Sequence, residues 1–147
     1  MLNSDYKEML QILLENEVRF LIVGAYAMGA HGYPRATGDL DIWVEASEKN
    51  SRKVYKSLTR FGSPLSQLTE ESFCEAGIVF QIGVAPRRID ILTHIDGVRF
   101  DDAYEAKEVI ELEGLRIPFL SKEDLLTNKK ATGRQRDKLD VDNLESA

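Results

Sequence analysis

The sequence predicts an α+β fold in which helices cover a mixed β-sheet. Short apolar segments that end at glycine or proline are typical of strands. Longer segments between them carry apolar residues at helical spacing. Two pairs of the short segments are joined by tight turns, as in antiparallel hairpins. Strands and helices interspersed in this way favour one layered α+β structure.

Helices are expected where an apolar stripe follows a capping residue. The predicted helices span residues 6–15, 25–30, 47–60, 121–133 and 136–144, and one further helical turn is expected within 66–75. Asn3 or Ser4 can cap the first helix, and Ser47 can cap the third. Ser121 and the acidic residues after it form a capping box, and Gly133 is placed to end that helix.

Strands are predicted at residues 19–23, 40–44, 78–84, 88–92, 109–112 and 115–117. Ala85-Pro86 and Glu113-Gly114 join two pairs of them as hairpins. The chain has 147 residues and no linker-like stretch, so one domain is expected over 1–147. Its core is expected at about 18–120, followed by a C-terminal helical tail at about 121–147.

The charge is acidic in total but uneven along the chain. The net charge is −6 and the pI is near 5.0, which does not favour nucleic-acid binding through bulk charge. Residues 116–138 carry seven Lys/Arg and three Asp/Glu, so this segment is +4 and the remainder −10. Its cations Lys129, Lys130 and Arg134 are candidates to bind a phosphate-bearing ligand. From charge alone, solvated surface charge is the favoured interpretation.

Cys74 is the single cysteine, so an internal disulfide is excluded and a reducing compartment is favoured. The sequence shows no apolar run of the ~18 residues that a membrane span needs, and no secretory leader. A cytoplasmic protein without a membrane partner is therefore expected.

Two aspartates lie at the start of the predicted strand 40–44, among residues expected in the core. Asp41 belongs to the strand, and Asp39 comes directly before it. Asp39 and Asp41 share one face of this strand, because alternate side chains point the same way, and Leu40 and Ile42 point the other way. Two like charges ~7 Å apart repel unless something positive lies between them. A metal ion is the favoured explanation, and the exposed face of an edge strand is the alternative.

Asp90 lies in a similar setting within the predicted strand 88–92. If that strand lies beside the strand of Asp41, three carboxylates converge, and such oxygen ligands suit Mg²⁺ or Mn²⁺. Two such ions ~3.5–4 Å apart serve in-line phosphoryl displacement. An ion pair to Arg87 or Arg88 is the alternative role for Asp90.

Gly24 and Ala25 end a predicted strand and open a short helix. Backbone N–H groups at such a point can hold a phosphate, and a glycine lets a triphosphate approach the chain closely. Arg35 and Thr37, in the loop before the aspartates, are further candidates to contact phosphate oxygens, with a solvated loop as the equal alternative.

In this order, these elements resemble the DNA polymerase β-like nucleotidyltransferase superfamily. Its pattern is an apolar strand, Gly-Gly or Gly-Ser, about a dozen residues, Asp-x-Asp or Asp-x-Glu, and later a lone acid in an apolar strand. Here the elements are Gly24-Ala25, Asp39-Leu40-Asp41 and Asp90, within residues 20–92. The stretch "HGYPRATGDLDIWV" is similar to small bacterial nucleotidyltransferase-like proteins related to toxin–antitoxin and abortive-infection enzymes. The tail "LLTNKKATGRQRDKLDVDNL" resembles their C-terminal helices.

The resemblance implies a Mg²⁺- or Mn²⁺-dependent transfer of a nucleoside monophosphate from an NTP to a hydroxyl, with release of pyrophosphate. The implied acceptor is RNA, such as a tRNA 3′ end, a protein hydroxyl or a small molecule. Asp39, Asp41 and Asp90 are the implied metal ligands and catalytic residues, and Asp90 helps to deprotonate the acceptor, directly or by positioning a metal. Ala25 departs from the pattern, since it keeps the backbone N–H but supplies no hydroxyl.

Two other functions fit the same residues. One is a catalytically silent module of this fold that binds a cognate toxin or antitoxin partner. The other is a metal-dependent phosphodiesterase that uses the same carboxylates.

Overall fold

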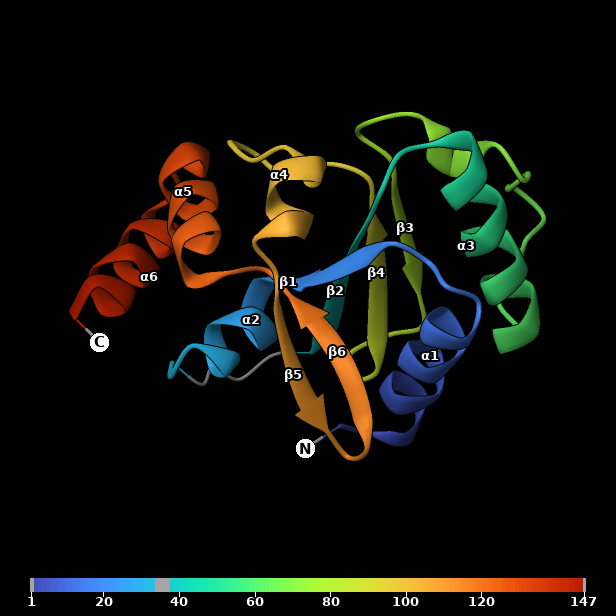
Figure 1. The fold of residues 1–147 in the computed structure, drawn as a ribbon, viewed down its shortest axis with the longest axis horizontal. Helices are drawn as coiled ribbons and strands as arrows, with labels where there is room; N and C mark the ends of the chain where they lie inside the picture. The colour runs from blue at the N-terminus through green and yellow to red at the C-terminus, as the bar shows by residue number, and fades with distance from the viewer. Residues whose placement is uncertain (1, 34–37, 147) are drawn as a thin grey trace.

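The computed structural model describes residues 2–33 and 38–146, which form a mixed six-stranded sheet in the order β3-β4-β2-β1-β6-β5 (Figure 1). The strands are β1 (Phe20–Val23), β2 (Asp39–Val44), β3 (Val79–Ile82), β4 (Arg88–Leu92), β5 (Glu108–Leu112) and β6 (Leu115–Phe119). β2 is parallel to β4 and β1 is parallel to β6, whereas the other neighbours are antiparallel. The predicted α+β class, mixed sheet and two hairpins are confirmed.

Helices lie on both sides of this sheet. They are α1 (Ser4–Glu15), α2 (Gly24–Ala30), α3 (Glu48–Phe61), α4 (Phe100–Glu105), α5 (Lys122–Thr132) and α6 (Gln135–Ser146), with a 3₁₀ turn at Ser72–Cys74. α1 and α3 lie together on one side, and α2, α5 and α6 lie on the other (Figure 1). Within the described residues, no helix has the length and apolar character of a membrane span.

The helix starts follow the predicted side-chain caps. The oxygens of Asn3, Ser47 and Ser121 accept hydrogen bonds from backbone N–H groups three residues later. These bonds satisfy donors that the first turn of a helix leaves unpaired. α4 was not predicted, because its six residues are too few to show an apolar stripe and its start has no side-chain cap.

The core lies between the sheet and the helices. All four residues of β1 are buried, and Leu40 and Ile42 of β2 are at most 1% exposed. Trp43, 2% exposed, packs edge-to-face against Phe100 of α4 with ring centroids 5.0 Å apart. The apolar positions of β2 therefore fix the strand firmly and determine which way its two aspartates point.

Candidate active site

The pairing of β2 with β4 brings the three predicted carboxylates together. In the parallel register Asp41 lies opposite Asp90, and Asp39 lies opposite Arg88. One carboxylate oxygen from each aspartate lies within 4.8 Å of the other two. The predicted convergence is thus observed, while the role of these side chains as metal ligands stays a prediction.

Gly24 is required by the close approach of Asp41. Its φ of +69° lies in the left-handed region, and a Cβ built there would lie 2.2 Å from Asp41 Oδ2. The sequence motif predicts that this space admits an approaching triphosphate. In the structure the Asp41 carboxylate fills it, so the glycine serves first to seat a member of the acidic cluster.

Arg88 provides the positive charge between the aspartates. Its Nη2 donates to Asp39 Oδ2 at 2.9 Å, and its Nε donates to Asp90 Oδ1 at 3.1 Å. Arg87 instead faces α1, with its Nη1 3.3 Å from Asp5 Oδ2. Of the two arginines predicted as alternative partners of Asp90, the structure selects Arg88, which also forms a hydrogen bond to Asp39.

The Arg88 guanidinium does not cancel the mutual repulsion of the carboxylates, and the pKa values reflect this. Burial, followed by repulsion from Asp39 and Asp90, raises the pKa of Asp41 to about 7. Burial also raises the pKa of Asp90, although the Arg88 charge opposes that shift. A set of convergent, mutually repelling oxygen ligands fits a divalent cation such as Mg²⁺ or Mn²⁺.

A cavity of about 580 Å³ opens over the acidic cluster. Six of the predicted site residues line it: Gly24, Ala25, Asp39, Asp41, Lys129 and Arg134. Four further residues, which the sequence motifs do not single out, line it too: Arg88, His94, Asp96 and Asn128. A cavity of this size matches the ~300–1,000 Å³ of small-molecule sites.

The missed residues belong to segments next to the aspartates. His94 and Asp96 follow β4 directly, and Asn128 on α5 donates to the Asp96 carbonyl at 3.0 Å. A chain that leaves the strand of Asp90 must pass close to it, which is the signal that could have found the first two. Of the other predicted positions, Arg35 and Thr37 lie outside the described residues.

Lys129 differs from the solvated charge that was favoured from charge alone. Its ammonium is buried, 3.1 Å from Asp137 Oδ1 and 3.3 Å from Asp140 Oδ2 on α6. Arg134 shares this network, because its Nε lies 2.6 Å from the second oxygen of Asp137. These contacts join α5 to α6 and fix Lys129 at the cavity wall.

Asp137 is the centre of that network and is fully buried. Burial alone would raise its pKa, but hydrogen bonds from Thr132, Arg134 and Lys129 outweigh burial and lower the pKa to about 2. The carboxylate is therefore ionised at neutral pH and holds two cations of the tail.

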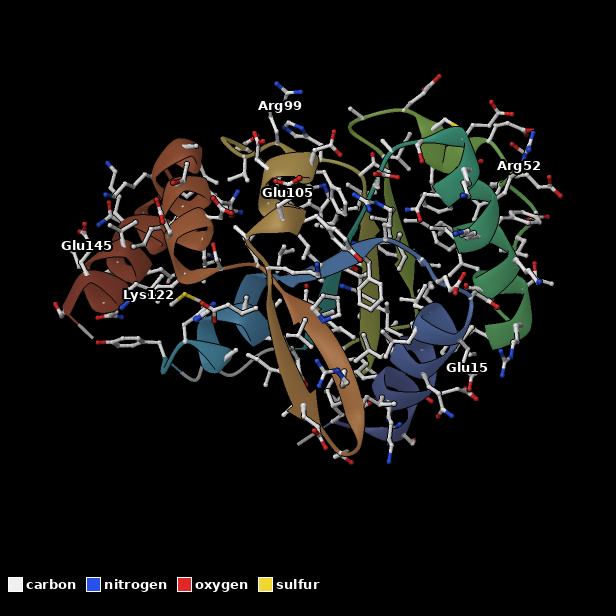
Figure 2. The ribbon with its side chains drawn as sticks, viewed as in Figure 1. Glu15, Arg52, Arg99, Glu105, Lys122 and Glu145 are labelled. Atoms are coloured by element: carbon white, nitrogen blue, oxygen red, sulfur yellow. The ribbon has the colours of Figure 1, made fainter. Side chains whose placement is uncertain are left out.

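Lys130 has a different environment from its neighbour. Its Nζ lies 3.2 Å from Glu145 Oε2, and both side chains are more than half exposed. Glu145 lies at the end of the molecule opposite to Arg52 of α3 (Figure 2). Lys130 is not among the residues that line the cavity.

The architecture is shared with nucleotidyltransferases of known structure. A protein of Thermotoga maritima, proposed to be a nucleotidyltransferase, superposes with a TM-score of 0.62 at 16% identity, over 99% of this chain and 94% of that chain. The lincosamide antibiotic adenylyltransferase LnuA, solved with lincomycin bound, has a TM-score of 0.61 at 16% identity. The superposition covers 99% of this chain and 98% of LnuA. ANT(2")-Ia, solved in complex with adenylyl-2"-tobramycin, has a TM-score of 0.52 at 14% identity, over 96% and 95%.

These likenesses confirm the polymerase β-like nucleotidyltransferase fold that the sequence motifs predicted. At these identities they concern the fold alone. No protein-family model matches the sequence, and no curated protein matches it either.

Proposed function

We propose that this protein is a nucleotidyltransferase, which moves a nucleoside monophosphate from an NTP to a hydroxyl acceptor and releases pyrophosphate. The observation that carries the proposal is the convergence of Asp39, Asp41 and the buried Asp90, the first two of which line one cavity. Nucleotidyltransferases of known structure share the fold around it, which supports the proposal. Three clustered carboxylates suit Mg²⁺ or Mn²⁺ as the bound cation, because both ions prefer oxygen ligands.

The reaction breaks a phosphoanhydride bond of the NTP and forms a phosphate ester bond to the acceptor. The acceptor oxygen forms a bond to the α-phosphorus, and the bond from that phosphorus to the pyrophosphate oxygen breaks. When bound, the divalent ion supplies positive charge that stabilises the phosphates and the leaving pyrophosphate. Asp39, Asp41 and Asp90 would hold it. In this proposal Asp90 helps to deprotonate the acceptor hydroxyl, either by accepting its proton directly or by positioning the ion, in which case the proton passes to water.

The triphosphate is proposed to lie in the cavity, between residues next to the carboxylates and the cations of α5 and the α5–α6 turn. Gly24 and Ala25 line the cavity through α2, and Lys129 and Arg134 line it through the α5–α6 unit. The cationic side chains of Lys129 and Arg134 complement the charge of the β- and γ-phosphates. Roles for Arg35, Thr37 and Lys130 in phosphate binding remain predictions from the sequence.

Among acceptors, a small hydroxylated molecule is the first to test. Two structures with this fold contain lincomycin or adenylyl-2"-tobramycin, and each covers nearly the whole chain. The cavity volume also suits a small ligand. RNA and protein hydroxyls are the other acceptors that the resemblance implies.

The second candidate function is a silent module that keeps the fold and binds a toxin or antitoxin partner. Ala25 favours it, because this position lacks the hydroxyl that a serine would offer to phosphate. The two candidates differ in one measurement, which is transfer of a labelled nucleotide.

The test uses each α-labelled NTP with Mg²⁺ or Mn²⁺, presented with total RNA, total protein or a panel of hydroxylated small molecules. We expect transfer from at least one NTP by wild type and none by Asp41→Asn. Transfer that survives in Asp41→Asn would overturn the site assignment. A complete lack of transfer by wild type would favour the silent module, and release of nucleotides from nucleic acid would favour a phosphodiesterase.

A further inference from the structure

Arg88 lies between Asp39 and Asp90, two of the carboxylates that would bind the proposed cation. Its Nη2 is 2.9 Å from Asp39 Oδ2, and its Nε and Nη2 are 3.1 and 3.4 Å from the two oxygens of Asp90. A guanidinium and a divalent ion that use the same oxygens are alternatives. The structure thus shows the acidic cluster with a cation supplied by the protein itself.

We propose that Arg88 is a positioning residue that holds the carboxylates while no metal is bound, and that turns to the NTP phosphates when metal and nucleotide bind together. This inference rests on the proposed function, since it assumes that the cluster of Asp39, Asp41 and Asp90 binds a divalent ion. It adds a consequence that the proposed function does not contain. The metal alone binds weakly, and the nucleotide strengthens metal binding.

The side chain of Arg88 is free to make this change, whereas its backbone is not. Its side chain is 36% exposed and lines the cavity, so the guanidinium has room to leave the carboxylates. The backbone is held in the β2–β4 ladder. In addition, the buried Tyr6 hydroxyl lies 3.0 Å from the carbonyl oxygens of both Pro86 and Arg88, to one of which it donates. The proposed motion therefore involves only the side chain of Arg88, while its backbone stays in place.

The polyphosphate supplies the partner that the guanidinium loses. Arginine presents a planar set of donors that matches phosphate as well as carboxylate, so its hydrogen bonds can be exchanged rather than lost. A metal ion that arrives without nucleotide must displace Arg88 into solvent. An ion that arrives with the triphosphate displaces it onto phosphate oxygens, so the two ligands favour each other's binding.

The chain offers a matched pair of variants to test this coupling. Arg88→Gln removes the bridging charge, and Arg87→Gln removes the same charge one residue earlier, where it faces Asp5. Arg88→Lys keeps the charge but not the forked geometry, and it serves if the glutamine variant does not fold. Mn²⁺ affinity is measured by calorimetry, with and without a non-hydrolysable ATP analogue, and circular dichroism checks the fold.

In wild type we expect the analogue to strengthen Mn²⁺ binding on the order of tenfold, within the usual range of coupling between two ligands. Arg88→Gln should bind Mn²⁺ alone more tightly than wild type does and should lose most of this coupling, whereas Arg87→Gln should match wild type. Unchanged Mn²⁺ affinity and coupling in Arg88→Gln would overturn the role of Arg88 while leaving the metal site standing. A lack of Mn²⁺ binding in wild type and both Arg88 variants, with and without the analogue, would instead show that the proposed function fails.

Discussion

Lys129 should be a major contributor to stability, although a basic residue in a helical tail resembles solvated charge. Lys129→Met removes an ammonium that lies within 3.3 Å of both Asp137 and Asp140, all three side chains being at most 7% exposed. Removing one partner of a buried ion pair costs about 3–5 kcal/mol, because the other charge stays buried without compensation. Arg134 still contacts Asp137 after the change, so the lower end, about 3 kcal/mol, is expected.

That free energy converts into a measurable shift. For a domain of this size, each kcal/mol lowers Tm by about 2–4 °C, so Lys129→Met should lower Tm by about 6–12 °C. Lys130→Met is the matched control, because it removes the same charge from the next residue of α5. Its exposed pair with Glu145 is worth about 0–1 kcal/mol, so its Tm should fall by no more than about 4 °C.

Thermal denaturation followed by circular dichroism at pH 7 compares the two variants. Equal melting temperatures for Lys129→Met and Lys130→Met would refute the buried-pair argument. Adding Asp140→Asn to Lys129→Met should recover part of the loss, since it removes one carboxylate that the first change leaves uncompensated. A further loss equal to the sum of two independent changes would show that the two residues do not act as a pair.

The remaining predictions concern the site and the pH dependence. Mn²⁺ should raise the Tm of wild type but not of Asp39→Asn/Asp41→Asn, and an equal rise in both would remove the metal assignment. Asp41→Asn should abolish label transfer without lowering Tm, because it relieves repulsion among three acids; a variant that unfolds would contradict this. Gly24→Ala should weaken Mn²⁺ binding measured by thermal shift, because its Cβ would meet an Asp41 oxygen. Gly32→Ala, also at positive φ but with no atom within 4 Å, should not. The pKa of Asp137, lowered from 3.8 to about 2, makes a contribution to stability that is present above pH 4 and lost as the pH falls toward 2. Asp137→Asn, although less stable at pH 7, should therefore lose less stability over that interval, and parallel Tm curves for the variant and wild type would argue against the shift.

Local rules were sufficient for most of the fold. Helix starts at Ser47 and Ser121 follow from hydrogen bonds between a residue and the backbone three positions later. The hairpins follow from tight turns between strands. These interactions span few residues, so they can be read from a short window. α4 could not, because it is held by packing of Phe100 on Trp43 rather than by a local signal.

The acidic side of the site was also predictable, for a related reason. The alternation of β2 places Asp39 and Asp41 on one face, and Asp90 shows the same pattern on its own strand. What the pattern lacks is the register between strands. The bridge from Arg88 to Asp39 exists because β2 and β4 pair in parallel with these residues opposite each other, a long-range relation.

Charge counting failed for Lys129 because it ignores partners on the next helix. Asp137 and Asp140 lie eight and eleven residues further along, and they face Lys129 only after the chain turns at Gly133. The sequence contains a basic cluster, whereas in the fold Lys129 and Arg134 form ion pairs with the buried acids of α6. The burial that makes Lys129 important for stability is the feature that its exposed neighbour Lys130 lacks.

The cationic side chains that line the cavity are already paired with acids, and this affects how the cavity binds an anionic ligand. Arg88 is held by Asp39 and Asp90, and Lys129 and Arg134 are held by the buried acids of α6. A triphosphate that enters without a cation therefore meets cations that are already neutralised, together with carboxylates that repel it. A divalent ion changes both conditions, because it offsets the carboxylates and, on our proposal, releases Arg88 toward the phosphates. On the proposed function, the cavity is therefore suited to a nucleotide that arrives with its metal, and this acidic protein would bind that polyanion without a basic surface.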